Sequence, residues 1–300
     1  MIRKALYIMS IAAMASCGTT KNKANVAAQE ISHDNREPVT AVVETPATKE
    51  NSFWGKLLGE ACREMDKENI CLSPLSAQFA MAMVANGAEG KTRTEIIDIM
   101  QLGDSANAKS RKLLDDIATK TVWNEHGDIR IANSIWIRED FDVKQEFVET
   151  NEEFLDALVE RAEFNQETVN RVNEWCKENT NGKIPTILDR FKDSDMMLLI
   201  NALYLKAAWS KPFREENTTE KIFTTEKGKE IEAPTMTMRS NEPFYSDDMV
   251  SMVSKRLQGG YSMLFILPSE NVKCDEAAEY VAKDFDTLLS NMEVRNVHLS

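Results

Sequence analysis

Residues 69–96 read NICLSPLSAQFAMAMVANGAEGKTRTEI, and this stretch decides the fold. Ser73 stands where a helix N-cap is expected and Pro74 at the first helical position, so a helix should begin here. Asn86-Gly87 is a pair typical of a helix end. Between these signals the apolar residues recur on one face: Leu75, Phe79, Ala82 and Met83. The stretch therefore predicts a helix that faces a hydrophobic core.

A second amphipathic helix is predicted from VNRVNEWCKENTNGKIP, residues 169–185. Asn181-Gly182 fits a left-handed C-terminal position, and Pro185 lies beyond it. The apolar stripe consists of Val169, Val172, Trp175 and Cys176. This helix should lie on another apolar surface.

Strand patterns alternate with these helices. Residues 129–137 place isoleucines and one asparagine on one side at a period of two, which predicts a strand with one buried face. Residues 196–209 and 261–268 are apolar almost throughout, which suits either a central strand covered on both faces or a buried helix. Residues 221–236 predict a hairpin with Gly228 in its turn. The irregular order of helices and strands indicates an α+β fold with more than one sheet.

The first residues predict an export signal. Arg3 and Lys4 precede an apolar run, residues 5–15, that is well short of the ~20 residues a membrane-spanning helix needs. The following MASCGTTKNK resembles a lipoprotein processing box, in which Cys17 would become the lipidated first residue. The alternative is an ordinary signal peptide with an incidental cysteine.

The chain divides into three segments. Residues 1–17 are interpreted as a lipoprotein signal peptide, and residues 18–51, with almost no large apolar side chain, as a flexible tether. Residues 52–300 should form the folded part, as one large domain or two small ones. We therefore expect an exported protein, lipid-anchored in the bacterial cell envelope at the outer membrane, or extracellular.

Composition excludes one class of partner. The net charge of −13 argues against nucleic acid, since phosphate binding needs a basic surface. The remaining cysteines are widely spaced and contain no CxxC pair, so buried thiols are expected rather than a disulfide framework or a metal site: Cys62, Cys71, Cys176 and Cys274.

The chain offers no pattern typical of an enzyme. No GxGxxG, GxxxxGK[ST], HExxH or GxSxG motif occurs. His33, His126 and His298 are the three histidines, and none neighbours a cysteine or carboxylate at metal spacing. We therefore expect no catalytic residue, no metal and no cofactor.

Polar residues within apolar runs are more informative, because an unpaired buried polar group costs about 1–3 kcal/mol. Asn201 stands in the middle of the longest apolar run, and Ser73 and Ser76 flank Pro74. One interpretation makes the serines a helix cap and its neighbour, and Asn201 a satisfied core amide. The other places all three in one buried hydrogen-bonded cluster under a sheet.

Residues 69–96 resemble the serpin signature, in which an asparagine, a Ser-Pro-x-Ser turn, a helix and a GAxGxT segment follow one another. Further blocks match in the right order: IANSIWIRE (131–139), VNEWCKENTNGKIPTIL (172–188), LLINALYLKAAWSKPF (198–213) and YSMLFILPSE (261–270). The resemblance runs from about residue 53 to the end of the chain.

This resemblance implies that residues 52–300 form one serpin domain, with multiple β-sheets and a helical shell. Residues 196–209 would then form a central strand of the large sheet. The helix from Val169 to Asn181 would lie across that sheet. By position, Ser73, Ser76 and Asn201 match the shutter cluster that governs sheet opening. Trp209 matches the breach tryptophan, and Asn69 and Pro74 match the signature.

The implied activity is inhibition of serine, and also cysteine, endopeptidases, by cleavage of a reactive loop and its insertion into the large sheet. The chain ends on NMEVRNVHLS, where an alternating pattern from Asn296 predicts the start of a strand. We expect the C-terminal strands and the reactive loop of the family to be absent from this chain. The alternatives are a non-inhibitory serpin-like lipoprotein for binding or assembly, and a truncated product without function.

Overall fold

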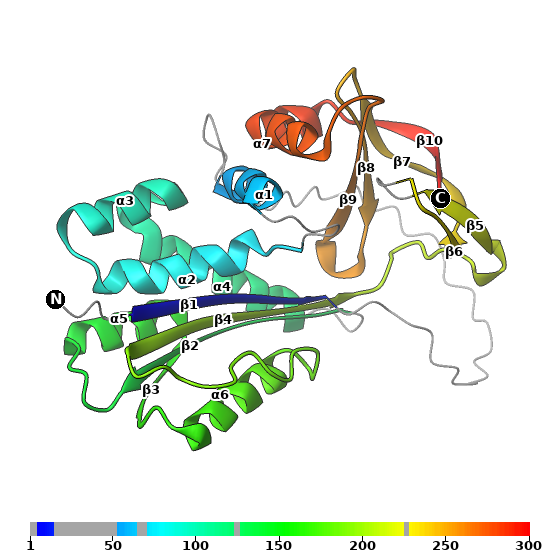
Figure 1. Ribbon diagram of the computed structural model, residues 1–300. Helices are drawn as coiled ribbons and strands as arrows, with labels where there is room; N and C mark the ends of the chain where they lie inside the picture. Colours follow the sequence, from blue (N-terminus) through cyan, green and yellow to red (C-terminus); the bar gives the residue numbers. More distant parts are fainter. Residues whose placement is uncertain (1–4, 15–52, 65–70, 123–126, 225–227) are drawn as a thin grey trace.

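The computed structural model describes residues 5–14, 53–64, 71–122, 127–224 and 228–300 (Figure 1). The helices are α1 Phe53–Glu64, α2 Pro74–Gly87, α3 Gly90–Met100, α4 Ala106–Val122, α5 Gln145–Leu155, α6 Gln166–Asn179 and α7 Cys274–Ser290. The strands are β1 Ala5–Met14, β2 Gly127–Arg138, β3 Ala157–Ala162, β4 Asp195–Ala207, β5 Thr218–Thr224, β6 Glu230–Met236, β7 Met238–Ser246, β8 Val250–Arg256, β9 Ser262–Pro268 and β10 Glu293–Leu299. The predicted α+β class is confirmed.

The large sheet has the strand order β1-β4-β2-β3. β4 runs antiparallel to β2, and β2 runs parallel to β3. The apolar run that sequence alone left open between strand and helix is therefore a strand, and it is buried along most of its length. β4 lies in the interior of the sheet, and apolar side chains project from both of its faces. Burial of these side chains on both faces stabilises the sheet.

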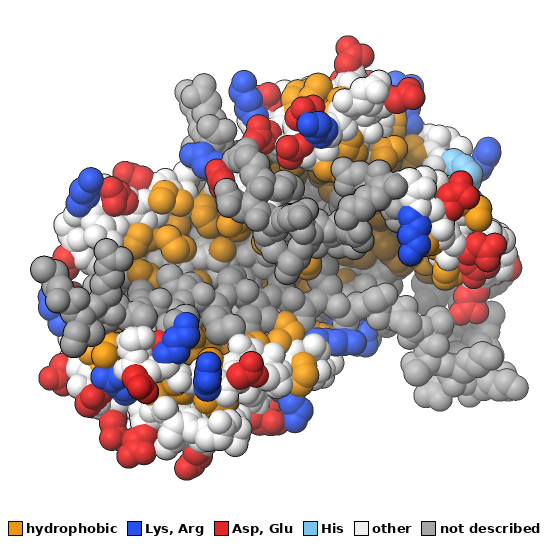
Figure 2. Space-filling view, viewed as in Figure 1, with side chains coloured by type: hydrophobic (Ala, Val, Ile, Leu, Met, Phe, Trp, Pro, Cys, Tyr) orange, Lys and Arg blue, Asp and Glu red, His pale blue; other side chains and the backbone are white. Residues whose placement is uncertain are grey.

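Helices cover both faces of this sheet (Figure 1). On one face, Phe79 and Met83 of α2 pack with Ile135 and Leu199 of the strands. On the other face, α6 lies across the sheet as predicted. Val172 and Cys176 of α6 are buried there, and they pack against Trp136, Leu198 and Ile200 of the strands. On the face seen in Figure 2, hydrophobic side chains gather over α2 and α3, and charged side chains lie along the outer rim.

The ends of α2 and α6 follow the predicted signals. Ser73 caps α2, and Pro74 is its first residue. After α6, Asn181 and Gly182 both adopt positive φ angles, of 51° and 75°, which is the left-handed conformation that Asn and Gly accept most readily. The chain can therefore turn sharply away from the sheet after α6.

The second sheet has the order β10-β7-β8-β9, and α7 covers it. Val250 and Met252 of β8 pack against Val281 of α7, and α1 adds Trp54, whose ring meets Phe285 edge-on at 5.2 Å. The predicted strand β9 is present, but its expected burial on both faces is wrong. Leu267 is 69% exposed, and Met263, Phe265 and Ile266 are also exposed. β9 lies at the edge of the sheet, and β8 is its one partner among the described strands.

The predicted hairpin is confirmed as β5 and β6, which pair antiparallel, with Gly228 at φ 75° in the turn region. Residues 225–227 lie outside the described residues.

β1 is an element that the sequence did not predict as a strand. Residues 5–14, interpreted above as the apolar part of an export signal, pair parallel with β4 along the edge opposite β2. Among the described residues, no helix is long and apolar enough to cross a bilayer.

The expectation of buried thiols is correct for one cysteine and wrong for two. Cys176 is buried under α6, and burial raises the pKa of its thiol to about 12. Cys71 lies just before α2 and Cys274 is the first residue of α7, and both are exposed. The side chain of Cys62 lies outside the described residues.

Candidate functional site

The N-terminus of α2 holds the two serines of the predicted shutter. The Ser73 hydroxyl oxygen accepts a hydrogen bond from the Ser76 backbone N–H at 3.1 Å, which satisfies one unpaired donor of the first turn. The Ser73 hydroxyl also donates to Ser76 Oγ at 2.7 Å. Ser76 is fully buried, on the same helix as the core residues Phe79 and Met83. The serines therefore act as a helix cap and are joined to each other.

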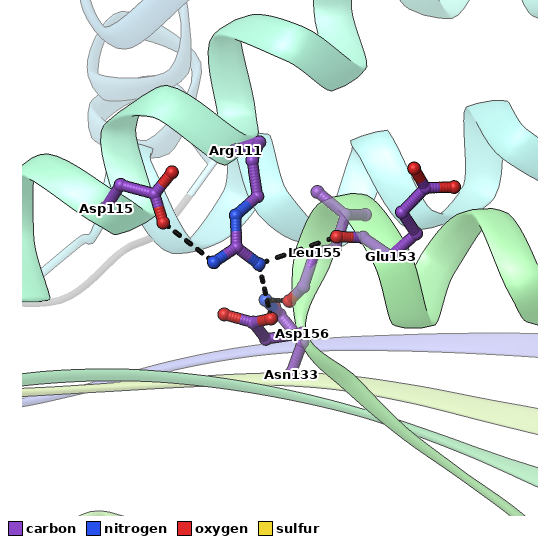
Figure 3. A network of polar contacts seen from close by, with 6 residues as sticks. All are labelled: Arg111, Asp115, Asn133, Glu153, Leu155 and Asp156. Atoms are coloured by element: carbon purple, nitrogen blue, oxygen red, sulfur yellow. Dashed lines mark hydrogen bonds and ion pairs between the residues drawn. The ribbon is translucent and has the colours of Figure 1, made fainter.

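Asn201 lies in the middle of β4, and its side chain is fully buried. Its Nδ2 donates to Asn133 Oδ1 at 2.8 Å, and the two residues stand directly opposite each other in the β2–β4 ladder. Asn133 Nδ2 in turn donates to the carbonyl oxygen of Leu155 at 2.7 Å (Figure 3). These two consecutive hydrogen bonds thus connect β4 to β2 and to the end of α5.

Asn133 was not singled out from the sequence, although it stood on the predicted buried side of its strand. Its role depends on the register that places it opposite Asn201, and register is a tertiary property. The alternation of Asn133 with isoleucines was the available signal, since an amide on a buried strand face needs a partner.

Asn201 also has an unused acceptor. Its Oδ1 is buried and has no hydrogen-bond partner among the residues that the structure describes. Such an oxygen lowers stability until a donor reaches it. The Asn201 side chain lies on the α2 face of the sheet. Leu199 packs against α2, and side chains two residues apart on a strand point to the same face.

Next to this chain of amides, Arg111 of α4 fastens the end of α5 (Figure 3). Its guanidinium donates to Asp115 at 2.7 Å, to Asp156 at 2.5 Å and to the carbonyl oxygen of Glu153 at 3.4 Å. The hydrogen bonds with Asp115 and Asp156 raise the pKa of Arg111. Arg111 therefore holds the backbone whose Leu155 carbonyl receives Asn133.

Trp209, the predicted breach residue, lies two residues beyond the end of β4. It forms an isolated antiparallel bridge with Leu257, and backbone hydrogen bonds flank the bridge on both sides: Ser210 N to Arg256 O at 3.1 Å and Gln258 N to Ala208 O at 2.8 Å. Its ring meets Phe213 edge-on at 5.8 Å and stacks on Phe265 at 6.2 Å. Trp209 is thus the point where the large sheet meets the second sheet.

The predicted residues therefore lie along β4 and α2, with Asn201 near the strand's middle and Trp209 past its end. Asn69 and Cys17 lie outside the described residues. A cavity of about 860 Å³ opens at the other end of β4, beside Met196, Met197 and Phe147. None of the predicted shutter or breach residues is among the described residues that line it.

Within the described ranges, no group of three or more His, Cys, Asp or Glu side chains could hold a metal ion. The arrangement is that of a strand held by amides and aromatic rings.

Comparisons with known proteins agree on one family. A family model described as Serpin (serine protease inhibitor) matches residues 48–300. Human neuroserpin is 31% identical over 187 residues, which are 61% of this chain and 45% of that protein. An uncharacterized serpin-like protein of Thermococcus kodakarensis is 27% identical over 257 residues, 83% of this chain and 59% of that protein.

Solved structures show the same likeness. The crystal structure of tengpin, a thermophilic serpin, in its native state matches with a TM-score of 0.74 at 30% identity. The match covers 83% of this chain and 64% of that one. The chain thus spans 59% or less of the two curated relatives named above, and 64% of the tengpin chain.

Proposed function

The chain belongs to the serpin family, and on that premise we propose that it forms the body of an exported inhibitor of serine or cysteine endopeptidases. The match of the family model across residues 48–300 carries this proposal. In the family-level mechanism, a protease cleaves an exposed loop, and the loop then enters the large sheet as a new strand. In this proposal the loop lies beyond Ser300.

Two features of the large sheet support the proposal. The edge of β4 opposite β2 can hold a strand, since β1 pairs there along ten residues of register. In this proposal, processing at Cys17 removes β1 and leaves that edge open to the cleaved loop. Asn201 stands in the middle of that strand with a buried oxygen that lacks a donor among the described residues. An open edge of β4 gains backbone hydrogen bonds when a strand pairs with it. A donor brought to the buried Asn201 oxygen would add stability separately.

The test compares two polypeptides. The first is this chain, and the second is the chain extended by the reading frame that follows the codon for Ser300. Each is incubated with a panel of serine and cysteine endopeptidases, and the products are separated on denaturing gels. We expect an SDS-stable covalent complex only for the extended polypeptide.

A complex formed by the 300-residue chain itself would contradict the placement of the loop beyond Ser300. An extended polypeptide that folds and yet forms no complex with any protease of the panel would contradict inhibition. That result would favour the second candidate, a non-inhibitory serpin-like body for binding or assembly.

The proposal includes export and a lipid on Cys17. The basic residues, apolar run and small residues before Cys17 support it. Growth of an expressing bacterium with an alkyne fatty acid should label the wild-type protein, and Cys17→Ser should abolish the label. Cys71→Ser is the matched control, because it removes a thiol outside the processing box. Label retained by Cys17→Ser would overturn the lipid assignment.

A further inference from the structure

Lys255 of β8 is a buried charge in a place where lysine is rare. Its side chain is 1% exposed. A buried ammonium is stable only with partners, because removing it from water costs several kcal/mol. The contacts of Lys255 therefore show what it does.

Two aromatic rings face the ammonium. Lys255 Nζ lies 5.6 Å from the centre of the Trp209 ring and 5.1 Å from the centre of the Phe213 ring. Both distances allow attraction between a cation and the negative face of a ring, and such attraction is stronger away from water. The two rings also contact each other edge-on. Lys255 and the rings thus form one packed group.

A carboxylate balances the charge. Glu242 of β7 is 7% exposed, and its Oε1 lies 3.5 Å from Lys255 Nζ. Ser240, also buried, donates its hydroxyl to the same oxygen at 2.8 Å. Ser240, Glu242 and Lys255 are thus three buried side chains of the second sheet that contact one another. Through Lys255 they contact Trp209, which lies in the segment that follows β4.

We propose that Lys255 is a positioning residue that holds Trp209 against the second sheet and so keeps the end of β4 closed. The inference rests on the proposed function in one respect, because only strand entry beside β4 would require this end to open. The Lys255 ammonium, whose charge Glu242 balances, attracts the Trp209 ring. This attraction keeps the backbone bridge between Trp209 and Leu257 in place.

Loss of the cation and loss of the pair have different consequences. Lys255→Met keeps a long apolar side chain but leaves Glu242 buried without its counter-charge. Lys255→Met combined with Glu242→Gln leaves no buried charge in this group. Lys255→Arg keeps a cation that attracts aromatic rings.

The experiment is hydrogen–deuterium exchange of the full chain, resolved to single amides. Ser210 and Gln258 donate the two hydrogen bonds that flank the Trp209 bridge, so their exchange reports its opening. We expect exchange of both amides to rise about tenfold or more in Lys255→Met. The double variant should also be faster than wild type, and Lys255→Arg should stay within about threefold.

Amides in the β2–β4 ladder, such as that of Ile135, are the internal control. A merely structural lysine would speed their exchange by the same factor, and that outcome would overturn the proposal. Unchanged exchange of Ser210 and Gln258 in Lys255→Met and in the double variant would also overturn it. If Lys255→Met does not fold, the double variant, which leaves no unpaired charge, decides between the same outcomes.

The measurement uses neither a protease nor a reactive loop. The exchange experiment therefore tests the role of Lys255 even if no inhibition is found. A negative exchange result, in turn, does not contradict the proposal of protease inhibition.

Discussion

Asn133 and Asn201 show what a single buried amide does in this protein. Each places a polar side chain in the buried part of an apolar sheet. The hydrogen bond between the two amides offsets part of the cost of burying them. Their pairing also connects β4 to the carbonyl of Leu155, so it acts across three elements.

Asn133→Ala removes the acceptor of Asn201 Nδ2 and the donor to Leu155 O, so the free energy of unfolding should fall by about 1–3 kcal/mol. Urea titration measures the change. Asn170→Ala on the exposed face of α6 is the control, and it should stay within about 0.5 kcal/mol. Equal effects of the two substitutions would contradict a special role for Asn133.

Asp247 carries a carboxylate that accepts hydrogen bonds from two tyrosine hydroxyls. Burial alone would raise the pKa of this carboxyl, but hydrogen bonds from the hydroxyls of Tyr280 and Tyr245 and from two backbone amides lower it to about 2. The same oxygen, Oδ2, accepts from Tyr245 at 2.7 Å and from Tyr280 at 2.5 Å, which ties β7 to α7. The carboxylate is therefore favoured in the folded state.

A carboxyl whose folded pKa lies below its unfolded value, ~3.9, contributes stability that is present above that value. The contribution is lost as the pH falls from about 4 to about 2. Asp247→Asn should therefore lose less stability than wild type over this pH interval, as measured by urea midpoints at several pH values. Asp248→Asn, at the exposed neighbouring position, should follow wild type. Parallel curves for wild type and Asp247→Asn would refute the assignment.

At the scale of elements, α2 depends on its first turn. Ser73→Ala removes the oxygen that caps the Ser76 amide and the donor to Ser76 Oγ, so stability should fall by about 1 kcal/mol. Ser73→Thr keeps the hydroxyl and should lose less. Thermal unfolding measures both variants, and an Ala variant as stable as the Thr variant would show that the cap contributes nothing.

Elements whose ends carry local signals could be predicted from the sequence. Ser73 and Pro74 start α2, and Asn181-Gly182 end the turn after α6, because capping depends on neighbours within a few residues. The strand β4 was ambiguous by itself, since a residue run that is apolar throughout has no period. It was assigned to the right class only through resemblance.

The burial of β9 could not be predicted in the same way. An apolar run indicates what a strand can bury, whereas its exposure depends on which elements lie beside it. The Lys255–Glu242 pair was missed for the converse reason, because charged residues in strands usually face solvent. Both depend on contacts between segments that are distant in sequence.

At the scale of the whole molecule, β9 presents a strand edge with exposed apolar side chains, including Leu267. Such an edge favours association between copies, because it offers both unpaired backbone groups and apolar surface. We expect the weight-average mass of the full chain in light scattering to rise with protein concentration.

Leu267→Lys should reduce that rise, since a charge on an edge strand opposes pairing. Ile99→Lys is the matched control, because Ile99 is an exposed apolar residue on a helix and not on a strand. A wild-type chain that stays monomeric at every concentration would contradict the prediction, as would an equal effect of the two lysines.

The buried thiol of Cys176 has a practical consequence. It lies between α6 and the large sheet, while Cys71 and Cys274 are open to solvent. A thiol-specific dye should therefore modify Cys71 and Cys274 promptly and Cys176 only when α6 leaves the sheet. The rate at which Cys176 is labelled, followed by peptide mass analysis, would then measure how often α6 separates from the large sheet, without any substitution in the protein.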